Sequence, residues 1–197
     1  MPSDAPLKLM VIMSSTRPGR VGLPVAKWFY ETALENGSFE VDFCDLLELN
    51  LPMLDEPNHP RLKQYEHQHT KDWSARVDAA DAFVIVTPEY NHGMTSALKN
   101  AIDFLHSEWH YKTCGFVSYG GVSGGTRSVE GIKPVVTCLR IMPVFETVAI
   151  AGFANMIKDG EFQAGDPQRN AAGAMLSELK RWAGPLRMLR ETEAAKA

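Results

Sequence analysis

Residues 82–88 read AFVIVTP, an apolar and β-branched run that ends in a proline. A continuous run of this length is typical of a strand that is buried on both faces. Such strands occur mainly in parallel sheets that carry helices on either side. We therefore predict that residues 82–87 form a central strand and that Pro88 ends it.

Four further strands can be placed around this one. Residues 8–13 form a short apolar run before a polar loop, and residues 39–44 alternate apolar and polar side chains, as a half-buried or edge strand does. Two more strands are predicted at residues 112–119 and 143–150. Segments with helical spacing separate and follow the strands, at residues 21–35, 62–80, 95–105, 126–140 and 167–190, with Asp166 as a cap before Pro167. The tail from residue 191 is expected to fray.

Strands that alternate with helices five times predict an α/β fold, a three-layer sandwich with a five-stranded parallel sheet. The 197 residues fit one domain, residues 1–197, and show no internal repeat or low-complexity linker. Asp159-Gly160 is expected to form a turn in the last third.

The charge of the chain excludes some classes of partner. A net charge of −4 gives no general attraction to nucleic acid or to an anionic membrane, so we expect neither as a partner. No apolar run is long enough to cross a bilayer and no export signal is visible, which favours a cytoplasmic protein. Cys44, Cys114 and Cys138 are far apart and odd in number, so they are expected to be buried free thiols.

Ligands of open parallel sheets bind beyond the carboxyl ends of the strands, where the strand order reverses. The first loop in such a position, residues 14–22, reads SSTRPGRVG and leads into a helix. Backbone N–H groups at a helix start, together with hydroxyls and guanidinium groups, favour a phosphate. A solvated, capped loop explains the same residues about equally well.

Two more loops follow predicted strands. The second loop, residues 87–93, reads TPEYNHG, in which proline and tyrosine can wall a flat ring and Asn91 can bind its polar edge. The third loop, residues 119–121, reads YGG, and its glycines let a ligand approach bare backbone. Taken alone, each loop has an ordinary alternative. The second loop is equally typical of a helix-entry turn, and the third of a flexible surface loop.

Several other known binding motifs are matched only in part and do not indicate a site. The first loop lacks the G-x-G-x-x-G spacing of a dinucleotide fingerprint, and Gly120–Gly125 lacks the lysine of a P-loop. His106 and His110 lack the adjacent glutamate of zinc hydrolases, so no metal site is predicted. Trp109 and Tyr111 are candidates for a rim over a bound ring or for a subunit contact.

In their order and spacing, the three loops together resemble the NADPH-dependent FMN reductases, a flavodoxin-like family that includes quinone, azo-dye and chromate reductases. Pro88-Glu89-Tyr90-Asn91 is the most specific part, and Ser15-Thr16-Arg17, Arg20 and the glycines after Tyr119 support it. Ser14 departs from the pattern, since family members often carry glycine there.

The resemblance implies a cofactor, FMN, and assigns residues to it. The phosphate and its flank would be held by Ser15, Arg17, Arg20, Val21 and Gly22. The isoalloxazine ring would lie against Pro88, Glu89, Tyr90 and Asn91, and its pyrimidine side against Tyr119, Gly120 and Gly121. NADPH or NADH would deliver hydride to the flavin, and a small molecule such as a quinone, azo compound, metal oxyanion or flavin would accept the electrons. The resemblance implies no catalytic side chain. It does imply a homodimer or a homotetramer.

Two other functions remain compatible with the sequence. A flavodoxin-type electron carrier or flavin-binding regulatory module would bind FMN without turnover. A non-redox enzyme acting on a phosphorylated metabolite would use the same crevice, because a fold alone does not fix function.

Overall fold

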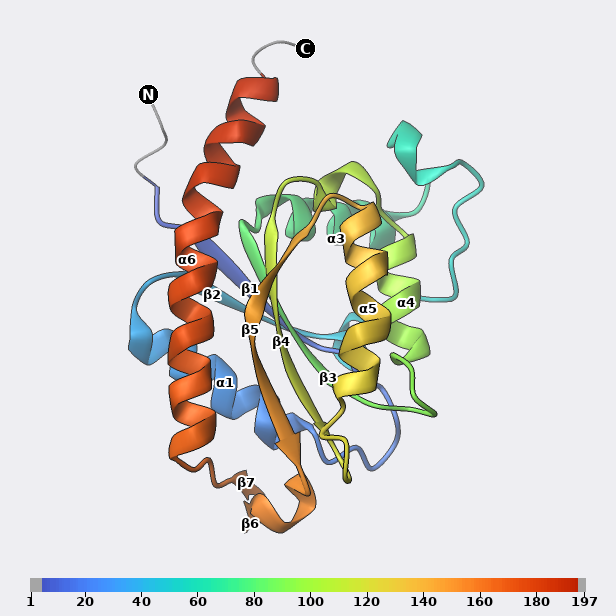
Figure 1. The fold of residues 1–197 in the computed structure, drawn as a ribbon. Helices are drawn as coiled ribbons and strands as arrows, with labels where there is room; N and C mark the ends of the chain where they lie inside the picture. Colours follow the sequence, from blue (N-terminus) through green and yellow to red (C-terminus); the bar gives the residue numbers. More distant parts are fainter. Residues whose placement is uncertain (1–4, 195–197) are drawn as a thin grey trace.

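Five strands form the all-parallel central sheet of the protein in the computed structural model, which describes residues 5–194 (Figure 1). The five strands are β1 (Lys8–Met13), β2 (Glu40–Asp45), β3 (Ala82–Pro88), β4 (Thr113–Gly120) and β5 (Met142–Ala151). They lie in the order β2-β1-β3-β4-β5, which is the flavodoxin-like order with its switch point between β1 and β3. The predicted fold class is confirmed, and every residue of β3 is buried, as its sequence indicates.

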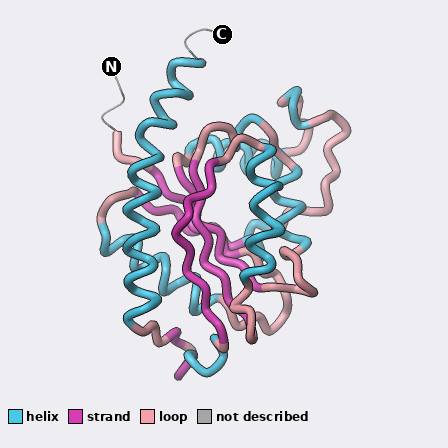
Figure 2. The backbone as a smooth tube through the Cα atoms, in the orientation of Figure 1, coloured by secondary structure: helices cyan, strands magenta, loops and turns pink. Residues whose placement is uncertain are grey.

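Helices cover both faces of the sheet (Figures 1 and 2). One face packs against α1 (Leu23–Asn36) and α6 (Asp166–Ala194), and the other against α3 (Gln68–Ala79), α4 (Ser96–Asp103) and α5 (Thr126–Cys138). Side chains of β1 alternate between two separate cores, with Leu9 and Val11 in the first and Met10 and Ile12 in the second. This double burial explains why the strand sequences are continuous apolar runs.

Short elements fill the connections. A four-residue helix, α2 (Leu46–Leu49), follows β2 directly because the Asp45 carboxylate caps it by accepting from the Leu47 N–H. Turns of 3₁₀ helix occur at Pro60–Leu62, Ser107–Trp109 and Phe153–Met156. A small hairpin of β6 (Ile157–Lys158) and β7 (Glu161–Phe162) surrounds Asp159-Gly160, which confirms the predicted turn.

The helix boundaries differ from the prediction at several ends. Helix α1 begins at Leu23, two residues late, with Gly22 as its N-cap. The helix expected from residue 62 begins only at Gln68, because Lys63 has a left-handed backbone that ends the preceding 3₁₀ turn. Asp166 lies in the first turn of α6 and not at its cap, where a negative charge still complements the helix dipole.

Other expectations were also too simple. Strand β3 ends at Pro88 as predicted, but Pro88 itself belongs to the strand, where it pairs with Tyr119. Residues 191–194, expected at a frayed end, form the last turn of α6, which runs to Ala194, while 195–197 lie outside the described residues. Cys44 and Cys114 are buried free thiols as predicted, but Cys138 is exposed at the end of α5. None of the helices in residues 5–194 is both long and apolar enough to span a bilayer.

Candidate functional site

The three predicted loops meet at the carboxyl edge of the sheet, the lower edge in Figure 1, and enclose one cleft. It holds about 530 Å³ of empty space, a volume that includes its open mouth. Ten of the twelve residues predicted for the site line this cleft: Ser15, Arg17, Arg20, Val21, Pro88, Glu89, Tyr90, Tyr119, Gly120 and Gly121. Gly22 and Asn91 do not, and Phe153 was not predicted.

The start of helix α1 makes one end of the cleft electropositive. Its N-cap is Gly22, no side chain caps it, and its first turn carries no acidic residue, so backbone N–H groups remain available. Arg17 is exposed, and its side chain makes no hydrogen bond or ion pair with any of residues 5–194. An uncapped helix start beside an unpaired guanidinium fits a phosphate group.

Arg20 also lines the cleft, but its guanidinium already has partners. It forms a two-pronged ion pair with the buried carboxylate of Asp45 and donates to the Ser15 carbonyl at 2.6 Å. The hydrogen bonds that Arg20 donates to Asp45 outweigh burial and raise the pKa of Arg20. The structure therefore gives Arg20 a role in shaping the first loop, whereas the sequence suggested a phosphate ligand.

Gly22 serves the cleft indirectly, through Tyr119. A Cβ atom at Gly22 would lie 1.9 Å from the Tyr119 hydroxyl oxygen and 2.1 Å from Cζ. Tyr119 is only 3% exposed, and its ring packs at 4.9 Å from that of Phe153. The Tyr119 ring thus packs directly against Gly22 at the end of the first loop, and only glycine at this position leaves room for the phenol.

Gly22→Ala is expected to destabilise the protein by about 1–2 kcal/mol, because a buried ring with no free space must shift. The same shift moves the first loop, so FMN affinity should fall too. Urea unfolding and flavin fluorescence titration measure the two effects. Gly37→Ala is the control for glycine removal beside α1, since a Cβ there meets nothing within 4 Å although its φ of 68° adds strain; equal effects on flavin affinity would contradict the steric reading.

The second loop contains a tight turn. Tyr90 and Gly93 exchange both backbone hydrogen bonds at 3.0 Å, and Asn91 and His92 between them have φ angles of 50° and 67°. Two central residues with positive φ define a type I′ turn, which asparagine accepts readily. The left-handed positions are therefore Asn91 and His92, not Gly93, and Asn91 lies exposed at the turn and outside the cleft.

Tyr90 connects the second loop to the first. Its phenol oxygen lies 2.7 Å from Ser15 Oγ, within hydrogen-bond distance. Glu89, the preceding residue, directs its carboxylate the other way, to Ser123 and Arg127 beyond the third loop. The wall of the cleft at this point therefore comes from the backbone and the tyrosine ring, and not from the charge of Glu89.

The third loop leaves the opposite wall bare. A Cβ atom at Gly121 would meet nothing within 4 Å, whereas one at Gly120 would lie 3.0 Å from the Gly125 nitrogen. The wall is thus open backbone that a flat ligand can approach. Phe153 adds an aromatic ring from the turn after β5; its position beyond a strand end was the available signal, but no motif marks it.

Ser14, the departure from the family pattern, is accommodated without left-handed backbone. Its N–H donates to the Val86 carbonyl at 3.0 Å and its carbonyl accepts from Thr95 Oγ1 at 2.8 Å. The buried Oγ has no hydrogen-bond partner among residues 5–194. These two backbone contacts hold the first loop against β3 and α4.

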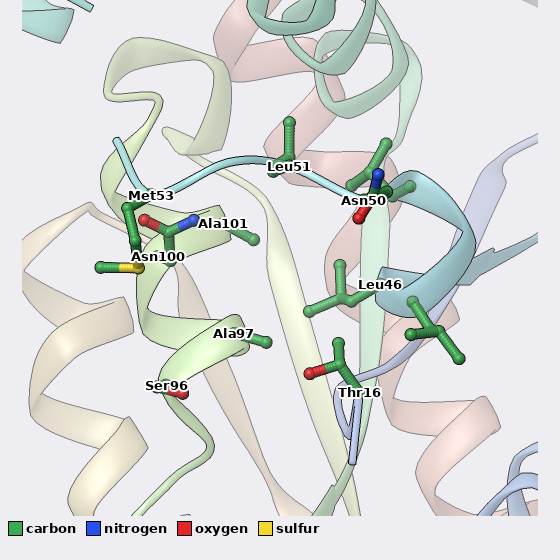
Figure 3. A pocket seen from close by; sticks show the side chains of 11 residues that line it. Thr16, Leu46, Asn50, Leu51, Met53, Ser96, Ala97, Asn100 and Ala101 are labelled. Atoms are coloured by element: carbon green, nitrogen blue, oxygen red, sulfur yellow. The ribbon is translucent and has the colours of Figure 1, made fainter. Parts of the chain in front are cut away.

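A second pocket lies beside the first loop (Figure 3). Thr16, between the cleft residues Ser15 and Arg17, lines it together with α2, α4 and the segment from Asn50 to Met53. Its lining mixes polar and apolar side chains and contains no charged residue, and the Asn100 amide is engaged by Pro52 and Leu54. This pocket cannot neutralise a phosphate, which the cleft can.

The histidine and aromatic cluster lies at the opposite edge. Because residues 106–111 precede β4, they sit at the amino ends of the strands, so Trp109 and Tyr111 do not line the cleft of their own chain, and the predicted subunit contact stays a prediction. Trp109 is buried against Trp73 and Phe83. Residues 5–194 contain no group of three or more side chains able to hold a metal ion.

Comparisons with known proteins agree with this geometry. Residues 7–155 match the model of the family described as NADPH-dependent FMN reductase. A Schizosaccharomyces pombe NAD(P)H-dependent FMN reductase is 42% identical over 120 residues, which is 60% of each chain. One from Saccharomyces cerevisiae is 35% identical over 156 residues, 73% of this chain and 80% of the other.

Solved structures share the fold. The flavoenzyme FerB of Paracoccus denitrificans, an NAD(P)H:(acceptor) oxidoreductase, superimposes with a TM-score of 0.71 at 18% identity, covering 90% of this chain and 97% of that one. The family match spans all three loops of the cleft. The chain belongs to the NADPH-dependent FMN reductase family.

Proposed function

We propose that this protein is an FMN-dependent oxidoreductase that takes hydride from NADPH or NADH and passes the electrons to a small-molecule acceptor such as a quinone or an azo compound. One observation carries the proposal: the cleft is electropositive at one end and flat at the other. Arg17 and the uncapped start of α1 form the first end. Pro88, Tyr90 and the bare backbone at Gly121 form the second.

The two ends suit the two parts of FMN. At the first end, N–H groups of α1 and the Arg17 guanidinium would bind the phosphate. At the second, the backbone of the second and third loops would hold the ring and leave one face open to the nicotinamide and then to the acceptor. Bound FMN supplies the two-electron chemistry, accepting hydride and returning two electrons that, with two protons, convert a quinone to a hydroquinone.

The side chains of the cleft supply position and electrostatics. Burial raises the pKa of Tyr119, so its phenol stays protonated and adds no negative charge beneath the ring. Glu89 is ionised, since its hydrogen bond from Arg127 lowers its pKa, but that charge is paired with the Arg127 guanidinium. Among the described residues, the cleft therefore contains no unpaired carboxylate that would repel the negative charge of a reduced flavin.

The visible spectrum of the purified protein tests the proposal. We expect one FMN per chain after reconstitution, bleaching with NADPH or NADH under anaerobic conditions, and return of colour when a quinone is added. A yellow protein without steady-state nicotinamide oxidation would indicate an electron carrier. A colourless protein that takes up no FMN would overturn the proposal and favour a site for another phosphorylated ligand.

Assembly and location are further proposals that the resemblance suggests. Leu47, Met53 and Leu54 beside the second pocket are 46%, 76% and 42% exposed, and clustered apolar side chains of this kind support a homodimer or homotetramer. Light scattering of the purified protein tests it. Three free cysteines, two of them buried, support a reducing compartment such as the cytoplasm.

A further inference from the structure

Among the described residues, the carboxylate of Glu89 binds only ones that follow the third loop. It accepts hydrogen bonds from Ser123 Oγ at 2.9 Å, Arg127 Nε at 2.6 Å and the Arg127 backbone N–H at 3.2 Å, and forms an ion pair with Arg127 Nη2. The Glu89 side chain is 7% exposed and that of Arg127 51%. The carboxylate therefore makes four contacts to the segment that joins the third loop to α5.

Helix α5 has no cap of its own. Its N-cap is Gly125, with a φ of 81°, no side chain of the helix binds its first N–H groups, and its first turn lacks an acidic residue. Glu89, 38 residues earlier, supplies both the missing acceptor and the negative charge. The second loop thus caps the helix that follows the third loop.

Glu89 and Tyr90 point to opposite sides of the cleft. Tyr90 reaches Ser15 of the first loop, and Glu89 reaches Ser123 and Arg127 past the third. Two consecutive residues therefore tie the second loop both to the first loop and to the segment that directly follows the third. We propose that Glu89 and Arg127 are positioning residues, whose side chains contact neither cofactor nor substrate but fix the second and third loops at the spacing that holds the ring.

This inference rests on the proposed function for its effect on catalysis, but not for its effect on the loops. In the flavin-free protein, Glu89→Gln should raise hydrogen exchange by about tenfold at amides of both segments, 89–93 and 121–127, because both lose one anchor. Glu130→Gln is the matched control, since it removes an exposed ion pair with Lys133 on the same helix. Faster exchange confined to residues 123–127 would overturn the proposal and leave Glu89 as a helix cap alone, as would exchange unchanged in both segments.

Kinetics of the FMN-loaded enzyme supply the second test. Glu89→Gln and Arg127→Ala should each lower kcat roughly tenfold while the KM for the nicotinamide changes less than twofold, since a misplaced ring slows transfer more than binding. The kcat of the double variant should be no lower than that of the less active single variant. Arg127→Lys should retain part of the kcat that Arg127→Ala loses. Wild-type kcat in both single variants, or losses that multiply in the double variant, would overturn the positioning role. If the wild-type protein takes up no FMN, the proposed function fails while the exchange result still stands.

Discussion

Replacing Arg17 by alanine is expected to weaken FMN binding about thirtyfold without changing the stability of the flavin-free protein. The Arg17 side chain has no protein partner among residues 5–194, so its removal breaks nothing in the fold. A charge-assisted hydrogen bond to a phosphate contributes about 2 kcal/mol, which corresponds to roughly thirtyfold in Kd. Fluorescence titration with FMN and urea unfolding of the flavin-free protein measure the two quantities.

Arg20→Ala is the matched comparison, three residues away in the same loop. It leaves the Asp45 carboxylate, 2% exposed, without its charged partner, so we expect a loss of about 3 kcal/mol in unfolding free energy. Riboflavin, which lacks the phosphate, adds a ligand control: Arg17→Ala should not alter its affinity. A variant of Arg17 that loses stability and FMN affinity equally, or one that also binds riboflavin more weakly, would contradict the phosphate role.

The sequence predicted the sheet well because its strands carry an unambiguous pattern. β1 and β3 are buried on both faces and read as apolar runs, and the alternation of residues 39–44 correctly indicated an edge strand, β2. The segment between β2 and β3 was harder to predict. Helix α2 depends on a single capping carboxylate, and the late start of α3 depends on one left-handed residue, Lys63, which no periodicity reveals.

The candidate site was predicted as a set of residues, not as a set of contacts. Strand ends brought together ten of the twelve predicted residues, because loops after parallel strands must share one edge. The direction of each side chain could not be predicted. Arg20 and Arg17 look equivalent in sequence, but only the fold brings the buried Asp45 to Arg20 and leaves Arg17 free. Glu89 likewise finds a partner 38 residues away.

A second buried carboxylate stabilises the opposite edge of the sheet. Asp81, immediately before β3, forms ion pairs with Arg187 and Arg190 of α6 and accepts from the Lys8 N–H at 2.9 Å. Arg187 also donates to the carbonyls of Ala5 and Pro6, so one network fixes the last turns of α6 to the start of β1. Burial alone would raise the pKa of Asp81, but the hydrogen bond from Arg187 and the other contacts hold it below its usual value.

Asp81→Asn is therefore expected to lower the unfolding free energy by about 3 kcal/mol at pH 7, since two guanidinium groups lose their shared charge partner. The pKa of Asp81 is lower in the folded state than in the unfolded state, so its contribution is complete above about pH 4 and is lost as the pH falls through the folded value. Urea unfolding at pH 7, 5, 4 and 3 should show a constant difference between wild type and variant down to about pH 5 that narrows below pH 4.

Because Asp81 lies far from the cleft, its substitution should affect stability but not FMN binding. The network lies at the amino edge and the cleft at the carboxyl edge, so Asp81→Asn should leave the Kd for FMN within about twofold at a temperature where the variant is folded. Glu178→Gln, which removes an exposed ion pair with Arg181 on the same helix, should change neither quantity by much. A difference that persists unchanged at pH 3 would show that Asp81 acts through shape and not through charge, and a weakened Kd would show that α6 transmits strain across the sheet.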